Sequence, residues 1–116
     1  MAAADTLGEG DLRVGLGRGG VIERAVVVTR RGSGGLAEHV PLLLPSWRRG
    51  YVAIGLFRPP GVRAWRDLDR LLRFLRDDLG YALPVSLHVE DCPRLAELRS
   101  IPRAALAGGH LTPPAS

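Results

Sequence analysis

One stretch of the chain constrains its fold more than any other: residues 21–31, with the sequence Val-Ile-Glu-Arg-Ala-Val-Val-Val-Thr-Arg-Arg. It is rich in β-branched residues and holds neither glycine nor proline, which is typical of a β-strand. Successive side chains of a strand point to opposite faces, and both faces of this one are mostly apolar at its centre. We therefore expect it in the middle of a sheet or at a subunit contact.

Four further segments have the composition of strands: residues 12–16, 36–44, 51–57 and 84–90. Pro41 lies inside the second of these, which predicts that this strand is at a sheet edge or is broken there. The glycine-rich residues 15–20 match G-x-G-x-x-G, but a dinucleotide site needs a helix after this motif. Since residues 21–31 predict a strand instead, a hairpin turn is the better interpretation.

Residues 62–79 predict one long amphipathic helix. Apolar side chains recur there at spacings of three and four residues, which places them on one face. These are Trp65, Leu68, Leu72, Leu75 and Leu79. Gly80 has the position of the glycine that often follows a helix end. A second, short helix is expected at residues 93–99, with proline in its first turn.

Together these elements predict an α+β fold: a largely antiparallel sheet of about five strands, one long amphipathic helix and a short C-terminal helix. We expect a flexible arm at residues 1–10, a single domain at 11–107 and a mobile tail at 108–116. One long helix covers only one face of such a sheet. The apolar surface left over favours a homodimer.

Composition narrows the function classes. All sixteen basic residues are arginine, and a chain without lysine cannot form a Schiff base. The net charge is +4, but arginines and aspartates alternate along residues 66–78, which argues against a nucleic-acid face. The single cysteine, Cys92, excludes an internal disulfide, and the histidines show no metal-ligand spacing. We therefore expect no metal and no cofactor.

Cellular location follows from two absences in the sequence. No apolar run approaches the roughly 20 residues that a membrane-spanning helix needs. The first residues, Met-Ala-Ala-Ala-Asp, carry neither the basic nor the apolar region of a signal peptide. The chain is therefore expected to be cytoplasmic, with no membrane partner.

Two strands carry the candidate acid–base residues. Glu23 is a carboxylate among apolar neighbours and can act as an acid or base, while an ordinary ion pair with Arg24 is the alternative. Ser86, His88 and Glu90 share one face of the strand at 84–90. Neighbours on that face stand about 6.5–7 Å apart, too far for a catalytic triad. We expect a polar cleft wall with His88 facing a ligand, or else a solvated histidine.

The remaining candidates are aromatic and arginine side chains. Trp47 and Tyr51 flank two arginines in and after a loop, which is typical of peptide contacts. The alternative is that both rings are buried in the core. Arg66 precedes two further arginines on the polar side of the expected helix, where it forms either a carboxylate-binding edge or an ordinary solvated face.

Taken as a whole, the chain resembles the lysinoalanine-forming proteins of cinnamycin- and duramycin-type lanthipeptide biosynthesis. The likeness lies in its size, its arginine-only basic set, residues 17–23 (Gly-Arg-Gly-Gly-Val-Ile-Glu), residues 41–45 (Pro-Leu-Leu-Leu-Pro) and the lack of a cofactor signature. The resemblance implies a homodimer that binds a modified peptide and adds a substrate lysine amine to dehydroalanine. No cofactor takes part, and a hydroxylated aspartate of the substrate acts as the base.

Residue roles under this resemblance follow from chemistry rather than from a family motif. Glu23 or His88 would orient the substrate amine or carboxylate, and Arg24 and Arg66 would hold carboxylates. Trp47 and Tyr51 would line the peptide groove.

Two alternatives stay open: a non-catalytic homodimeric module that binds a peptide or protein, and a small DNA-associated regulator. An enzyme predicts titratable groups buried in one closed pocket, whereas a binding module predicts a shallow groove.

Overall fold

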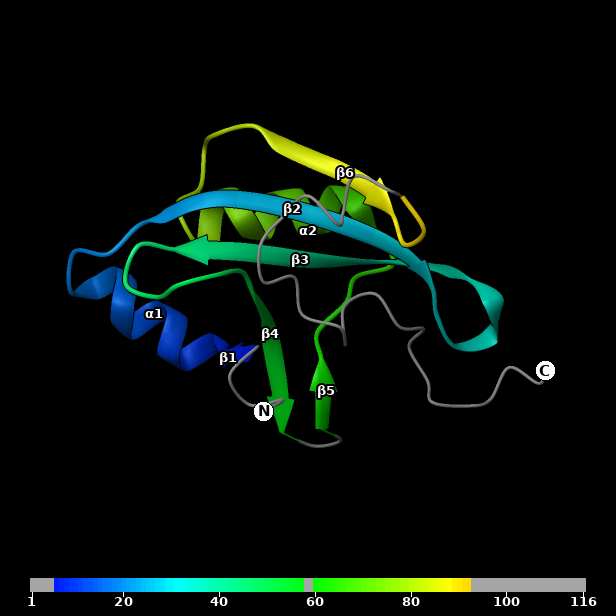
Figure 1. Ribbon diagram of the computed structural model, residues 1–116, viewed down its shortest axis with the longest axis horizontal. Helices are drawn as coiled ribbons and strands as arrows, with labels where there is room; N and C mark the ends of the chain where they lie inside the picture. The colour runs from blue at the N-terminus through cyan, green and yellow to red at the C-terminus, as the bar shows by residue number, and fades with distance from the viewer. Residues whose placement is uncertain (1–5, 58–59, 93–116) are drawn as a thin grey trace.

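The computed structural model describes residues 6–57 and 60–92. Its described part is an α+β structure with a six-stranded mixed sheet in the order β1-β4-β3-β2-β6, while β5 pairs with β4 (Figure 1). The strands are β1 (Thr6–Gly8), β2 (Ile22–Arg31), β3 (Ala37–Pro45), β4 (Val52–Phe57), β5 (Pro60–Val62) and β6 (Val85–Val89). The helical segments are α1 (Glu9–Gly17), η2 (Ser33–Gly35), α2 (Leu68–Arg73) and η3 (Phe74–Asp78).

The long antiparallel pair of β2 and β3 forms the centre of the sheet. Val26 lies opposite Leu42 and Val28 opposite Val40, and β2 has β6 as its other neighbour. The central position predicted for β2 is thus confirmed. Its β-branched side chains are buried on both faces of the sheet, because β2 has a strand on each side and both sheet faces are covered.

The sheet is mixed, so the expectation of a largely antiparallel sheet is wrong. β1 runs parallel to β4, and β6 runs parallel to β2. Parallel neighbours need a long crossover connection rather than a hairpin. The chain between β2 and β6 provides one, since it passes through three further strands and α2 before it returns (Figure 1).

The expectation of one long helix at residues 62–79 is also wrong, because the first third of this segment is not helical. Val62 ends β5 and pairs with Gly55, while Trp65 bridges to His39 on β3. Helix α2 begins after Asp67, whose carboxylate accepts hydrogen bonds from the backbone N–H groups of Asp69 and Arg70, as a helix cap does. It continues as the wider turn η3, and Gly80 follows with the predicted left-handed conformation (φ 72°).

The N-terminal third differs most from expectation. A strand was expected at residues 12–16 and a loose arm at 1–10, but Thr6–Gly8 forms β1 and Glu9–Gly17 forms α1. Leu12 and Leu16, four residues apart, pack on one core cluster. The carboxylate of Glu9 pairs with Arg13 and with Arg63, each at 2.7 Å, so α1 is tied to a distant part of the chain. The hairpin turn expected at residues 15–20 is instead the end of α1 and the turn after it.

Strand β3 lies inside the sheet despite Pro41. His39 exchanges backbone hydrogen bonds with Trp65 on the side away from β2. Since alternate residues of a strand turn their backbone groups to the same side, Pro41 faces that side too. The ladder to β4 begins only at Leu42 and Leu43, so Pro41 lies in the gap before it. Its missing N–H therefore interrupts no ladder, and the edge position predicted from proline does not apply.

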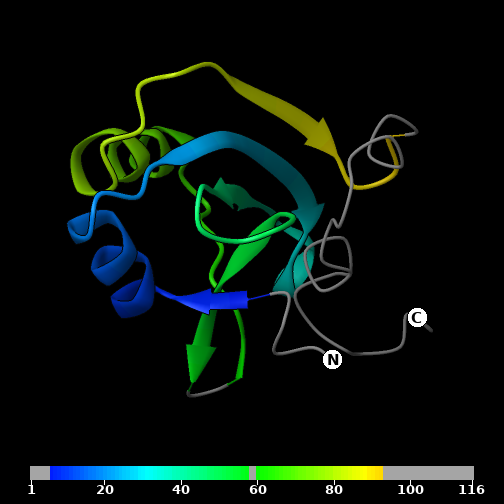
Figure 2. The ribbon, with the colours of Figure 1, turned by 60° about the vertical axis from the view of Figure 1, so that its left-hand side comes forward.

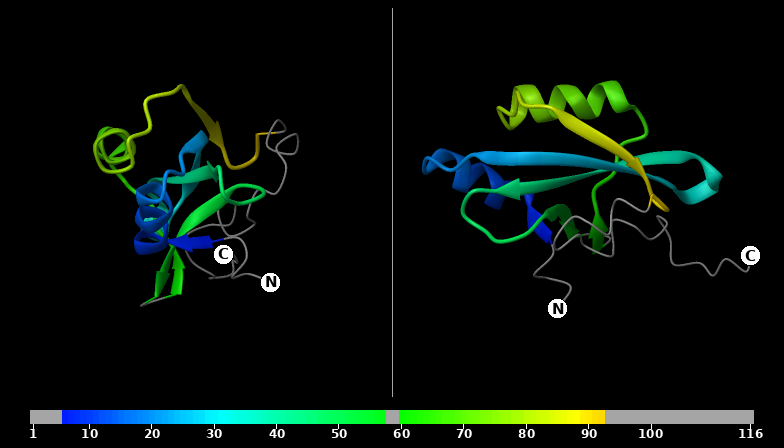
Figure 3. Two further views of the ribbon diagram at one scale, coloured as in Figure 1. Left: turned by 90° about the vertical axis from the view of Figure 1, so that its left-hand side faces the viewer. Right: turned by 45° about the horizontal axis from the view of Figure 1, so that its top comes forward.

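Both faces of the central strands are buried. Helices α1 and α2 lie on the same face, where they enclose a cluster that includes Leu12, Val27 and Leu71 (Figures 2 and 3). The opposite face carries a second cluster, with Val28, Leu42 and Tyr51 among its buried members. An uncovered sheet face therefore no longer argues for a dimer, and the homodimer stays a prediction. The helix expected at residues 93–99 and the tail expected at 108–116 lie outside the described residues.

Candidate functional site

The site begins at a β-bulge in β2. Ile22 lies opposite Pro45 and Arg24 lies opposite Leu44, so Glu23 is an extra residue with no partner on β3. A bulge bends its strand and redirects the side chain at that point. The side chain of Glu23 is accordingly exposed, although its strand is buried over the following residues. No ion pair of Glu23 occurs within the described residues.

The same end of β2 has an open edge. Strand β6 begins at Val85, opposite Ala25, so no strand within the described residues lies beside β2 on that side before Ala25. The connection from η3 to β6 passes there and meets β2 through Tyr81. The Tyr81 hydroxyl accepts a hydrogen bond from the Ala25 N–H at 3.2 Å and donates one to the Pro84 carbonyl at 2.6 Å.

Two open pockets meet at this point and share Glu23, Tyr81 and Leu83; together we call them the bulge groove. The larger has a volume of about 810 Å³, and Glu23 is the only charged residue among its described lining residues. Its other walls are apolar or glycine: Leu16, Gly20, Val21, Ile22, Leu79, Gly80 and Ala82. The smaller, of about 390 Å³, adds Arg24, Tyr51 and Ser86. The groove thus combines apolar walls with one carboxylate and one guanidinium group.

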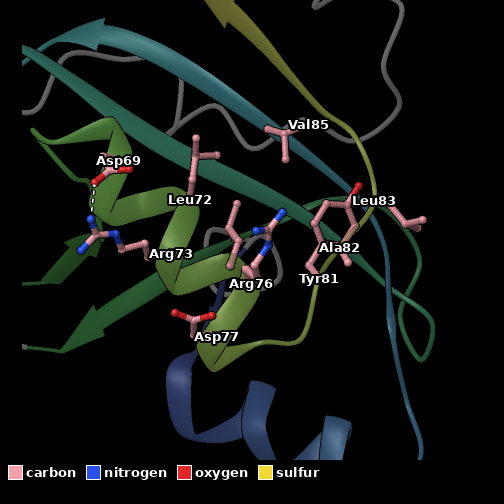
Figure 4. Close-up of a pocket in the computed structure, with 10 residues that line it drawn as sticks. Asp69, Leu72, Arg73, Arg76, Asp77, Tyr81, Ala82, Leu83 and Val85 are labelled. Carbon is pink, nitrogen blue, oxygen red and sulfur yellow. Dashed lines mark ion pairs between the residues drawn. The ribbon is translucent and has the colours of Figure 1, made fainter.

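A third pocket, of about 510 Å³, lies on the helix side of the same connection (Figure 4). Its helical wall presents Arg76 and Asp77 together with the ion pair between Asp69 and Arg73, whose atoms lie 2.9 Å apart. These side chains form the solvated face of α2 and η3. The pocket therefore has the character of an exposed helix surface rather than of a reaction centre.

Three of the predicted site residues come together in the bulge groove: Glu23, Arg24 and Tyr51. Glu23 and Arg24 are exposed there and can reach a ligand. Tyr51 is buried and belongs to the core cluster on the face of the sheet opposite the helices. The core alternative for Tyr51 is therefore correct, and its contribution to the groove is a wall.

His88, the second predicted catalytic residue, lies elsewhere. It pairs with Val28, five residues along β2 from Glu23, which is about 16 Å at the rise of a strand. Its Nδ1 atom is 3.6 Å from the Sγ atom of Cys92. Glu90 lies just beyond β6 and accepts a hydrogen bond from the Arg31 N–H. The two predicted catalytic residues therefore do not form one site.

Trp47 and Arg66 also lie apart from the groove. The indole ring of Trp47 lies against Gly15 and Gly20, where a Cβ atom at either glycine would overlap it. Arg66 precedes the cap of α2, at the end of that helix opposite Gly80. Neither residue lines the bulge groove, so the peptide contact predicted for Trp47 and the carboxylate contact predicted for Arg66 stay predictions.

Tyr81 and Leu83 are groove residues that the sequence did not single out. A residue that follows a left-handed glycine commonly folds back on its helix, and the Tyr81 N–H indeed donates to the Leu75 carbonyl. An aromatic residue directly after Gly80 was therefore an available signal for a side chain turned toward the sheet. Leu83 lies between Ala82 and Pro84, and no pattern in the sequence indicates its exposure.

Within the described residues, no three acidic, histidine or cysteine side chains come close enough together to hold a metal ion. None of the helices in residues 6–57 and 60–92 has the length and apolar character needed to cross a bilayer. Comparisons with protein-family models, with curated proteins and with solved structures find no match to this chain.

Proposed function

We propose that this protein binds a peptide in the bulge groove. The observation that supports this is the open edge of β2 beside apolar walls, with an exposed carboxylate at the bulge. An extended peptide can pair its backbone with such an edge while its side chains enter the adjoining pockets. The groove is open and its carboxylate is exposed, which fits binding better than an enclosed acid–base pocket.

Charge and shape indicate the kind of peptide. The larger pocket is apolar apart from Glu23, so it suits a side chain with an aliphatic stem and a cationic end. Arg24, in the adjoining pocket, suits a carboxylate of the same ligand. A lysine beside a carboxylate group meets both requirements.

The finer proposal is that the peptide is a dehydrated lanthipeptide and that the bound lysine closes a lysinoalanine crosslink. In this reaction the neutral amine nitrogen adds to the β-carbon of dehydroalanine, and the electron pair passes to the carbonyl as an enolate. The amine loses its proton to a base, the α-carbon gains one, and nothing leaves. The resemblance assigns the base to a hydroxylated aspartate of the substrate, so Glu23 holds the amine and need not deprotonate it.

Proximity is what the protein would contribute. Holding amine and alkene in reacting geometry raises their effective concentration by several orders of magnitude, which is the largest gain available to a chain without a cofactor. The absence of lysine from the chain means that no lysine side chain of the protein competes for the dehydroalanine. Arg24 can stabilise the developing enolate if the peptide places its carbonyl there.

A titration with a fluorescent dehydrated lanthipeptide tests the binding proposal. Leu83 lines the groove and is 57% exposed, whereas Leu36 is 55% exposed and lies just before β3. Leu83→Arg places a guanidinium beside Glu23 and should weaken binding at least tenfold, while Leu36→Arg changes the charge equally and should leave affinity unchanged. Equal affinity of both variants and the wild type would place the binding surface elsewhere.

A further inference from the structure

The outer edge of β6 is a second surface, which adjoins the bulge groove because Val85 and Ser86 also line the smaller pocket. Within the described residues β6 pairs only with β2. The N–H of Glu90 donates to the carbonyl of Thr29, so the even-numbered residues of β6 turn their backbone groups toward β2. Because the direction alternates along a strand, the backbone groups of Val85, Leu87 and Val89 face outward. Of these, the Val89 carbonyl already accepts one bond, from the Cys92 N–H.

The side chains of the same residues make this edge apolar. Leu87 is 53% exposed and Val89 is 55% exposed, and both lie on the face of the sheet that carries the helices, since Leu87 pairs with Val27. Strand β6 has no charged residue, no proline and no bulge among its five positions. Charged residues, prolines and bulges are the usual features that keep an edge strand from pairing with another chain. An edge without them is ready to accept a strand.

We infer that the strand it accepts is β6 of a second copy, antiparallel, about a twofold axis at Leu87. In this register Leu87 faces the partner's Leu87, and Val85 faces the partner's Val89. Each of these is a hydrogen-bonded pair, because the outward-facing residues of one strand meet the outward-facing residues of the other. The Val89 carbonyl can accept a second bond, since a carbonyl oxygen has two lone pairs.

The same register matches side chains on both faces. Leucine meets leucine and valine meets valine on the helix face, and such apolar cross-strand pairs stabilise a sheet. On the opposite face Ser86 lies beside the partner's His88. A strand of another protein has no reason to match this pattern, whereas a twofold copy matches it by symmetry.

Charges at the ends of β6 agree with this arrangement. Asp91 is exposed just after the strand, and Arg76 lines the pocket next to Val85 at its beginning (Figure 4). Neither forms an ion pair within the described residues. Antiparallel pairing brings the end of one β6 next to the beginning of the other. Asp91 therefore lies on the side of the partner's Arg76, so opposite charges meet at both ends of the interface.

Single-cysteine crosslinking tests the register directly. In a Cys92→Ser background, Leu87→Cys places two thiols across the twofold axis. The Cα atoms of a hydrogen-bonded antiparallel pair lie about 5.5 Å apart, which is within the range of a disulfide. Mild oxidation should give a covalent dimer on a non-reducing gel. Val89→Cys is equally exposed but faces the partner's Val85, so it should give none.

Sedimentation of the full chain supplies the independent readout. The wild type should be a dimer, Leu87→Arg a folded monomer because two guanidinium groups would meet at the axis, and Leu36→Arg still a dimer. Circular dichroism reports whether Leu87→Arg is folded; if it is not, the cysteine variants decide. A monomeric wild type, or equal crosslinking at positions 87 and 89, would overturn the inference.

Discussion

The hydroxyl group of Tyr81 lies 3.2 Å from the backbone nitrogen of Ala25 and accepts its hydrogen bond, although the two residues are 56 positions apart. Ala25 is the first residue of β2 that has a partner on β6. The hydroxyl therefore accepts the backbone N–H of Ala25 at the point where the pairing of β2 with β6 begins. It also holds the connection between η3 and β6 against the sheet, and so shapes the bulge groove.

Tyr81→Phe should destabilise the protein by about 1–3 kcal/mol, because the buried Ala25 N–H loses its acceptor and the Pro84 carbonyl its donor. Chemical denaturation measures this change. Tyr51→Phe is the matched control, since no hydrogen bond of the Tyr51 hydroxyl occurs in the described residues and its removal should cost much less. If both variants lose the same stability, the Tyr81 hydroxyl does not have the role assigned to it.

Gly15 and Gly17 both lie in α1 and should respond oppositely to alanine. A Cβ atom at Gly15 would overlap the indole ring of Trp47, whereas no atom of the described residues lies within 4 Å of one at Gly17. Gly15→Ala should therefore cost about 1–3 kcal/mol, as overpacking does. Gly17→Ala should instead add roughly 0.5–1 kcal/mol, because alanine loses less backbone entropy in a helix than glycine does. Thermal unfolding of the two variants decides, and a stabilised Gly15→Ala would contradict the packing of Trp47.

The ion pair between Arg30 and Glu38 should matter far more than that between Arg73 and Asp69. In the first, Arg30 is buried and Glu38 partly buried, with Nε and Oε2 2.8 Å apart, while both partners of the second are exposed. Glu38→Gln replaces a charged partner of the buried Arg30 guanidinium by a neutral one and should cost about 1.5–3 kcal/mol. Asp69→Asn should cost less than about 1 kcal/mol. Denaturation at low and high salt separates them, because added salt should weaken only the exposed pair.

Glu23 should recognise the cationic end of the bound side chain. Glu23→Gln removes the charge and keeps the shape, so it should weaken binding of a lysine-containing peptide about tenfold, as loss of a charge-assisted bond does. The same peptide with norleucine in place of lysine should bind wild type and variant alike. Isothermal titration of both peptides into both proteins gives the coupling free energy between Glu23 and the lysine amine directly. An equal loss for both peptides would show that Glu23 supports the groove without meeting the ligand.

Some of the fold could be predicted because local pattern and tertiary structure agree. Residues 22–31 are rich in β-branched side chains and residues 52–57 are apolar, and both segments form strands. Gly80 was predicted at the helix end because only glycine adopts its backbone conformation without strain. In these places the local preference is strong enough that no distant contact reverses it.

Other parts depend on contacts that no local pattern shows. Helix α1 contains three glycines, so its intrinsic helix preference is poor, and it forms because Leu12 and Leu16 pack on the core. Residues 62 and 65 fit the apolar spacing of a helix, but backbone pairing with Gly55 and His39 takes both into the sheet. The bulge at Glu23 requires a one-residue shift between two strands, and neither strand alone encodes it.

The central claim is most directly tested by incubating the protein with a dehydrated, hydroxylated and already cyclised lanthipeptide that still has its lysine. The account predicts that the free lysine amine disappears, as an amine-specific reagent detects, while the mass of the peptide stays unchanged. Leu83→Arg should slow this loss, and Leu36→Arg should not. A lysine that stays fully reactive with the wild-type protein under all conditions would contradict the account, even if the peptide binds.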